Sequence, residues 1–290
     1  MTVLKRKRLR IAVIALTIAL AILLSGAAIY VLRGEWIYRV SQLFRRYDAP
    51  DLREMTEGEW EMWRMDELLA DGRVSQNTIL MLVNANHPIP EEFAVDLTEY
   101  NGAKMNPQMV EHYIALRDRV QRRTGVRIYV AADYRSAEEQ EAIYAESESG
   151  IAAPVGCSEH EAGLALDVYA PRCAGINFLR SPAGRLVNRI CGEHGFVIRY
   201  AEGKENVTGI SFEPWHLRYV GAPHASVMMD SGLVLEEYLE LLTPNVWYES
   251  GEYLILRTDA TEELQMPSDW SSCEISPDNT GYVILTVKIR

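Results

Sequence analysis

The stretch S-E-H-E-A-G-L-A-L-D, from Ser158 to Asp167, is the part of this sequence around which the rest can be interpreted. Gly163 interrupts it, and the residues over 164–168 then alternate in the way that is typical of a strand. The pattern therefore predicts a loop that runs into a strand. His160 is expected at the mouth of this strand and Asp167 on the strand itself.

A second short motif, E-P-W-H over 213–216, completes a possible metal site. Two histidines and one aspartate can hold a catalytic zinc ion with a fourth position open. We therefore expect one zinc ion per chain, bound by His160, Asp167 and His216. Glu213 lies close enough to act as a general base without binding the metal. Because residues three apart on a strand face opposite sides, Pro214 is expected to mark an irregularity.

Other kinds of reactive site find less support in the sequence. Ser158 and His160 are only two residues apart and no G-x-S-x-G motif occurs, which argues against a serine hydrolase. The four cysteines lack the C-x-x-C spacing of a zinc knuckle and are expected to form one or two disulfides or to be buried thiols, with the pairing left open. They are Cys157, Cys173, Cys191 and Cys273.

The N-terminus has the charge pattern of a membrane anchor. Basic residues at 5–10 precede an uncharged apolar run over 11–32, which is long enough to cross a bilayer core of about 30 Å. The positive-inside rule predicts a single-pass protein of the cell membrane, with a cytoplasmic N-terminus and an extracytoplasmic catalytic domain. The alternative is a cleaved signal peptide ending near the small residues at 25–28.

The charge balance argues against nucleic acid as a partner. The chain has 41 acidic residues against 29 Lys and Arg, a formal net charge of −12 at pH 7, and its first acidic residue is Glu35. Such a surface repels the phosphate backbone. We expect no nucleic-acid binding.

The order of predicted elements indicates an α+β fold, with a central antiparallel sheet and flanking helices. We divide the chain into five parts: a basic segment (1–10), a transmembrane helix (11–32), a stalk (33–75), a zinc domain (76–243) and a small β appendage (244–290). Helices are expected over 106–124, 136–145, 181–194 and 222–242, and in the stalk over 57–70. Strands are expected over 126–131, 196–200, 209–219, 253–256 and 282–289, and a strand or extended arm over 79–83.

The motifs S-x-H-x-x-G-x-A-x-D and E-P-W-H together resemble the VanY-type D-alanyl-D-alanine carboxypeptidases, in the zinc peptidase group that includes lysostaphin-like peptidases and the hedgehog domain. Further matches are L-V-N at 82–84, Y-R-S at 134–136 with Gln140, G-F at 195–196 with R-Y at 199–200, and R-Y-V-G at 218–221. The resemblance spans roughly 80–221, about half of the chain. It implies a hedgehog-like fold for this part.

The resemblance also implies roles for individual residues. His160, Asp167 and His216 match the zinc ligands of the family, and Glu213 matches its catalytic base. Residues that match the substrate-binding positions are Arg135, for the terminal carboxylate, and Ser158, Gln140, Tyr200 and Trp215, which line or flank the pocket. The expected activity is a zinc metallocarboxypeptidase that removes the C-terminal D-Ala from peptidoglycan stem peptides or precursors.

Three alternatives remain open at this point. The enzyme could be an L,D-carboxypeptidase that acts on tetrapeptide stems, or a D,D-dipeptidase. In another class, the chain could be a non-catalytic zinc-binding module like the hedgehog domain, which needs neither Glu213 nor Arg135. The family also implies a role in glycopeptide (vancomycin) resistance, because removal of the last residue destroys the D-Ala-D-Ala terminus.

Overall fold

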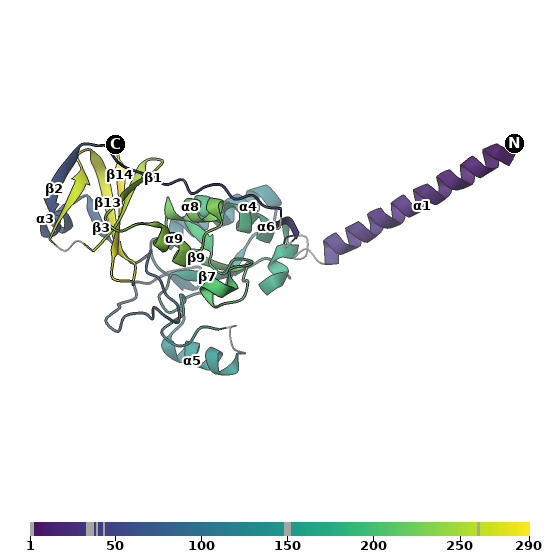
Figure 1. The fold of residues 1–290 in the computed structure, drawn as a ribbon. Helices are drawn as coiled ribbons and strands as arrows, with labels where there is room; N and C mark the ends of the chain where they lie inside the picture. The colour runs from purple at the N-terminus through teal and green to yellow at the C-terminus, as the bar shows by residue number, and fades with distance from the viewer. Residues whose placement is uncertain (1–2, 33–37, 39, 43, 148–151, 260–261) are drawn as a thin grey trace.

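A computed structural model describes residues 3–32, 38, 40–42, 44–147, 152–259 and 262–290. The first helix, α1 (Val3–Leu32), extends away from the rest of the molecule (Figure 1). Within these residues, none of the helices combines the length and the apolar character that a bilayer crossing requires. This finding contradicts the expected transmembrane anchor over 11–32 and the single-pass membrane location inferred from it.

The expected α+β class with an antiparallel central sheet is confirmed. Four strands pair antiparallel in the order β6-β7-β9-β8. They are β6 (Tyr129–Ala132), β7 (Ala165–Tyr169), β9 (His216–Tyr219) and β8 (Phe196–Ile198). Around this sheet lie the helices α4 (Met109–Thr124), α5 (Ala137–Glu146), α6 (Pro182–Ile190), α7 (Glu205–Thr208), α8 (His224–Ser231) and α9 (Leu235–Leu241), with the 3₁₀ turns η1 (Gly175–Arg180) and η2 (Cys191–His194).

A second sheet of six strands forms from both ends of the chain, in the order β1-β10-β11-β14-β13-β3. Its strands are β1 (Arg53–Glu54), β3 (Val74–Gln76), β10 (Trp247–Ser250), β11 (Tyr253–Thr258), β13 (Trp270–Pro277) and β14 (Val283–Ile289). Beside it, β2 (Trp60–Arg64) pairs with β12 (Glu263–Pro267), and helix α3 (Met65–Ala70) follows β2. Part of the segment expected to be a stalk is thus hydrogen-bonded to the C-terminal strands.

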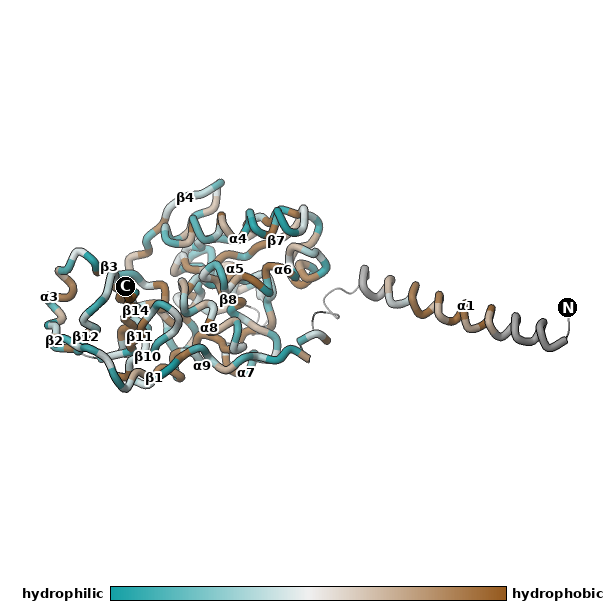
Figure 2. Tube along the Cα trace, turned by 90° about the horizontal axis from the view of Figure 1, so that it is seen from above, coloured by the Kyte–Doolittle hydropathy of each residue, from teal (hydrophilic) through white to brown (hydrophobic). Residues whose placement is uncertain are grey.

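Two clusters of buried hydrophobic side chains support these sheets. The smaller cluster lies around Trp270 and Leu285 in the six-stranded sheet. The larger one surrounds the four-stranded sheet but also includes Ile255 and Ile284 from β11 and β14. The hydropathy colouring shows apolar residues in these C-terminal strands, as it does in other elements (Figure 2). The two sheets therefore share apolar contacts.

Several predicted elements differ from the observed ones. Of the strand or arm expected over 79–83, the structure has a buried arm outside the strands, whose backbone bonds to the turn after β13 (Leu82 N to Asp278 O, 3.0 Å). The helix expected over 222–242 is divided into α8 and α9 at Gly232, whose φ of 69° ends α8. The strand expected over 209–219 begins only at His216. The helix expected over 57–70 is strand β2 followed by α3.

A hairpin of β4 (Thr98–Tyr100) and β5 (Ala103–Met105) precedes α4.

All four cysteines are free thiols, and three of them are buried. Of the two outcomes expected for the cysteines, the structure has the buried thiols and not the disulfides. Burial raises the pKa of the Cys191 and Cys273 thiols to about 12, so these two groups stay protonated at neutral pH.

Candidate active site

Two of the predicted metal ligands face each other across a pair of strands. Asp167 on β7 and His216 on β9 are register partners in the antiparallel ladder. Side chains of such partners lie on the same face of the sheet. The Oδ1 atom of Asp167 is 3.1 Å from Nδ1 of His216. Strand pairing alone therefore brings together residues that are 49 positions apart in the sequence.

The third predicted ligand, His160, comes from the turn that leads into β7. Gly163 makes this turn possible: its φ is +68°, and a side chain there would press against Leu97. The Nδ1 atom of His160 is 2.7 Å from the backbone oxygen of Asp133, and its Nε2 atom is 3.5 Å from Asp167 Oδ1. The imidazole is therefore held on one side by the backbone and faces Asp167 on the other.

The arrangement of His160, Asp167 and His216 fits a zinc ion. Ligand atoms about 2.1 Å from a tetrahedral ion are about 3.4 Å from one another, close to the separations of 3.1 and 3.5 Å found here. One ligand atom from each residue lies within 4.8 Å of the others. Asp167 Oδ1 is buried and accepts no hydrogen bond of good geometry, which leaves it available to a cation.

Glu213 lies beside this cluster in the turn before β9. Its backbone N donates to Tyr200 O, and its carbonyl accepts from His216 N, so the expected irregularity at Pro214 is this turn. Glu213 Oε2 is 3.7 Å from His216 Nδ1. Burial raises the pKa of Glu213 to about 7; His216 opposes this shift and the Asp167 carboxylate adds to it. A carboxyl group with such a pKa can exchange a proton near neutral pH.

Four of the five predicted substrate-binding residues line the same cavity, which has a volume of about 160 Å³: Arg135, Gln140, Ser158 and Tyr200. Nη1 of Arg135 donates to Gln140 Oε1 at 2.7 Å. Gln140 in turn donates to the carbonyl of Ala153. The guanidinium is thus oriented by a buried amide. Ile143, Ala152, Ala153 and Ile210 give the cavity an apolar wall.

Trp215 is not among the side chains that line this cavity. Its backbone carbonyl accepts from Val168 N, and its half-buried ring packs against the larger hydrophobic cluster. In this structure Trp215 supports the strand pair under the site. Its adjacency to His216 in the sequence does not make it part of the pocket, because residues 214–215 form a turn.

A group of buried charges behind the site was missed by the sequence analysis. Glu159 is completely buried and pairs with Arg199 and Arg218 at 2.7 Å each. Arg199 also pairs with Glu236 on α9. The available signal was a pair of arginines within the apolar stretches F-V-I-R-Y and H-L-R-Y-V, because a charge inside a buried strand needs a partner. Sequence alone does not name that partner.

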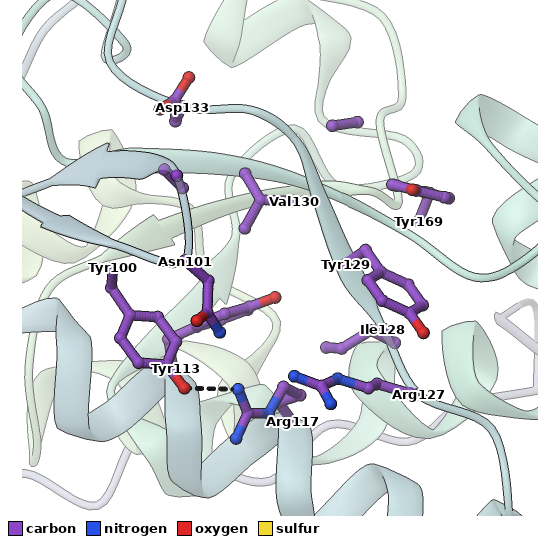
Figure 3. A pocket seen from close by; sticks show the side chains of 13 residues that line it. Tyr100, Asn101, Tyr113, Arg117, Arg127, Ile128, Tyr129, Val130, Asp133 and Tyr169 are labelled. Atoms are coloured by element: carbon purple, nitrogen blue, oxygen red, sulfur yellow. Dashed lines mark hydrogen bonds between the residues drawn. The ribbon is translucent and has the colours of Figure 1, made fainter.

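A separate cavity of about 290 Å³ lies between the β4–β5 hairpin, α4 and β6. Figure 3 shows its wall of tyrosines, with Arg117 donating to Tyr100. None of the predicted catalytic, metal or substrate residues lines it. Asp133 lines this cavity, and its backbone carbonyl holds His160 of the metal site.

Comparisons with known proteins agree with this geometry. The family model described as "VanY: D-alanyl-D-alanine carboxypeptidase" matches residues 102–222. The D-alanyl-D-alanine carboxypeptidase of Enterococcus faecium is 28% identical, over 84% of this chain and 86% of its own length. The bifunctional D-Ala-D-Ala dipeptidase and D-Ala-D-Ala carboxypeptidase VanXYC of Enterococcus gallinarum is 34% identical, over 58% of this chain and 96% of its own length.

A solved structure shows the same relationship in three dimensions. The vancomycin resistance D,D-dipeptidase VanXYg, in complex with a D-Ala-D-Ala phosphinate analogue, has a TM-score of 0.61 and 25% identity, and the match covers 79% of this chain and 98% of that one. Sequence motifs, site geometry and these matches lead to one assignment. This chain belongs to the VanY family of D-alanyl-D-alanine carboxypeptidases, which are zinc metallopeptidases.

Proposed function

We propose that this protein is a zinc-dependent D,D-carboxypeptidase that removes the C-terminal D-Ala from peptidoglycan stem peptides or their precursors. The observation that carries the proposal is the content of a single cavity. His160, Asp167 and His216 line it together with Glu213 and Arg135. A module that only binds zinc needs neither a buried base nor a guanidinium in its metal pocket.

Glu213 is the general base of the proposed reaction. A zinc ion held by the three ligands supplies Lewis-acid activation of water and stabilises negative charge on the substrate carbonyl oxygen. Glu213 takes a proton from the attacking water and delivers it to the leaving amine of D-Ala. Its raised pKa suits both steps, since the group must accept and release a proton within one turnover.

Arg135 selects a chain end over an internal peptide bond. A planar guanidinium pairs with a carboxylate through two parallel hydrogen bonds, which an internal amide cannot offer. The bond from Arg135 to Gln140 uses one Nη1 hydrogen and leaves other N–H groups for the substrate. The apolar wall formed by Ala152, Ala153 and Ile210 suits a methyl side chain.

The shape of the surface supports a substrate longer than a dipeptide. A neighbouring cavity of about 240 Å³ shares Ala152, Ala153, Tyr200 and Ile210 with the cavity at the metal site. Because these four residues line both cavities, the two adjoin each other and together offer more room than the two residues that flank the cleaved bond require. We propose that a pentapeptide stem occupies both.

The proposal is tested by product analysis. The purified protein is incubated with a pentapeptide stem, a tetrapeptide stem and D-Ala-D-Ala, each with zinc and with a chelator, and D-alanine release is measured. We expect zinc-dependent release from the pentapeptide. Release from the tetrapeptide alone would indicate L,D-specificity, and preference for the free dipeptide would indicate a dipeptidase. No release from any substrate would eliminate the enzymatic role.

A role in glycopeptide resistance follows from this chemistry, because the product lacks the D-Ala-D-Ala terminus. Expression of the protein in a susceptible bacterium should then raise the inhibitory concentration of vancomycin. The Glu213→Gln protein is the matched control, because it should be produced at the same level without activity. Equal inhibitory concentrations for both proteins would contradict the role.

A further inference from the structure

The two histidines of the metal site face it with different nitrogen atoms. His160 directs Nε2 to Asp167, while its Nδ1 is held by the Asp133 carbonyl. His216 directs Nδ1 to Asp167 and Glu213. Its Nε2 atom is 3.3 Å from Oε2 of Glu159. The ring planes are almost perpendicular, at 88°. Each imidazole thus has one nitrogen at the metal position and the other on a protein oxygen.

Glu159 is held in one orientation by the two arginines behind it. Its Oε1 accepts from Arg199 Nε and from Arg218 Nη1, both at 2.7 Å. Both arginines and Glu159 are 0% exposed at their side chains. The other oxygen, Oε2, is left to face His216. A carboxylate that pairs with two buried guanidinium groups is retained in its ionised form and cannot rotate without breaking both pairs.

The arginines are themselves fixed by other parts of the fold. Arg199 donates its two terminal nitrogens to Glu236 on α9, at 2.8 and 2.6 Å. Arg218 donates from Nη2 to the carbonyls of Ile79 and Met81 in the buried arm. Two carboxylates therefore balance two guanidinium groups, and no net charge is buried. This arrangement provides a rigid support behind His216.

We propose that Glu159 is a positioning residue for His216: it accepts the Nε2–H of the imidazole and thereby fixes the tautomer whose Nδ1 lone pair points to the metal. The inference rests on the proposed zinc function. A neutral imidazole carries its proton on one nitrogen only, and the hydrogen bond at the other nitrogen decides which. Loss of such an outer partner typically weakens metal binding by about 10–100-fold.

Two substitutions separate positioning from structural support. Glu159→Gln keeps the shape but places an amide donor against His216 or an arginine. Glu159→Asp keeps the charge that balances Arg199 and Arg218 but withdraws the carboxylate from His216. The zinc dissociation constant is measured by competition with a chromophoric chelator. We expect both folded variants to bind zinc about 10–100-fold more weakly than the natural protein.

Asp278→Asn is the matched control. Asp278 is also a fully buried carboxylate, and it pairs with Arg257 at 2.7 Å, but it lies in the turn after β13 and touches none of the three ligands. The control should lower the melting temperature of the metal-free protein while leaving the zinc dissociation constant within twofold. Folded Glu159 variants that bind zinc as tightly as this control would overturn the inference.

A measurement on the natural protein covers the case in which neither Glu159 variant folds. In a long-range ¹H–¹⁵N spectrum of the ¹⁵N-histidine-labelled zinc form, we expect one metal-bound histidine to coordinate through Nδ1 and the other through Nε2. Coordination of both through Nε2 would contradict the role of Glu159. If zinc does not bind at all, the proposed function and this inference both fail. If the natural protein shows zinc-dependent hydrolysis and the Glu159 variants bind zinc as tightly as it does, only the inference fails.

Discussion

Glu213, the general base of the proposed reaction, lies in surroundings unlike those of a carboxylate on the protein surface. Its side chain is 16% exposed and lies near both Asp167 and His216. Burial raises its pKa to about 7, whereas a glutamate exposed to water is fully ionised at that pH.

The Glu213→Gln substitution should abolish most of the activity and preserve zinc binding. The amide keeps the shape of the side chain but cannot accept a proton, so we expect kcat to fall by about 10²–10⁴-fold. His216→Ala serves as the contrasting variant and should lose both activity and zinc. The measurements are kcat on a pentapeptide stem and zinc content after dialysis. A Gln variant with near-full turnover would remove Glu213 from its role.

The Arg135→Lys substitution tests recognition of the chain end. Lysine keeps the positive charge but cannot form two parallel bonds to a carboxylate or replace the bond to Gln140. We expect kcat/KM for a peptide acid to fall by about 10–100-fold, which corresponds to a charge-assisted hydrogen bond of 1.5–3 kcal/mol. A C-terminally amidated peptide is the control substrate, and its slow cleavage should not change. Equal losses for acid and amide would argue against carboxylate recognition.

We expect the stability of the protein to depend on pH through the buried His224. It is buried between Tyr238 Oη (2.6 Å) and Thr286 Oγ1 (2.8 Å), and burial lowers its pKa to about 3. The unfolded chain protonates this group near pH 6.5 while the folded chain does not. The contribution of neutral His224 to the free energy of unfolding is therefore complete above pH 6.5 and is lost as the pH falls towards 3. At pH 5 the loss is about 2 kcal/mol.

Chemical unfolding of metal-free protein between pH 7 and 5 checks this expectation. The His224→Gln protein lacks the titrating group and should lose less stability over that range than the natural protein. The comparison between the two proteins removes the contribution of every other group. Parallel pH profiles for the two proteins would show that His224 does not cause the effect.

At the scale of elements, the start of α5 is placed so that it holds Arg135 at the cavity. Ser136 caps the helix: its side chain accepts from Glu139 N, and Glu139 Oε2 accepts from Ser136 N at 2.8 Å. These two bonds form a capping box, which is the pattern that S-x-x-E predicts at the start of a helix. One turn further on, the buried Gln140 meets the Arg135 guanidinium. The helix therefore supplies both the orientation and the support of the arginine.

The Ser136→Ala substitution should destabilise this helix start. Loss of an N-cap side chain costs about 1 kcal/mol. We expect faster hydrogen exchange in the first turn of α5 and a higher KM for the peptide acid, because Arg135 is less well held. Glu141→Ala, on the exposed surface of the same helix, is the control and should leave both unchanged. Unchanged exchange in the Ser136 variant would mean that tertiary contacts hold the helix start.

At the scale of the whole molecule, the C-terminal strands hold parts of the chain that support the site. Asn279 donates to the carbonyls of Leu82, His87 and Pro88. Thr286 on β14 bonds to His224 on α8. Ile255 and Ile284 belong to the hydrophobic cluster that surrounds the four-stranded sheet. We infer that residues 244–290, predicted to be a small appendage, are needed for the stability of the catalytic part.

A protein truncated after Thr243 should accordingly be unstable. The truncated protein loses the burial of Ile255 and Ile284, and each buried side chain of this size contributes roughly 1.5–3 kcal/mol to stability. The buried arm at 79–83 also loses its backbone hydrogen-bond partners. Circular dichroism and thermal melting measure the outcome. A truncated protein that melts cooperatively at the natural temperature and retains activity would show that the appendage is independent.

The chemistry of the site can be read from the amino-acid sequence. The ligand types, their motifs and the helix cap at Ser136 depend on side-chain chemistry and short-range geometry, which neighbouring residues specify. The same reasoning identified helix α4 and the strand that carries Asp167. It misplaced elements whose conformation depends on distant contacts, such as the first half of the helix expected over 57–70, which pairs with β12 as a strand, and it expected a membrane anchor that the described helices do not support.

Which residues meet in space depends on the folded chain. Asp167 and His216 become neighbours through the β7–β9 register, and Trp215 packs against the larger hydrophobic cluster without lining the cavity, although it adjoins His216. Glu159 gains its place behind His216 because two arginines, one just after β8 and one on β9, neutralise it there. The physical reason is that buried charges and strand partners are chosen by long-range packing. A linear motif records which groups are present but not which partner each one finds.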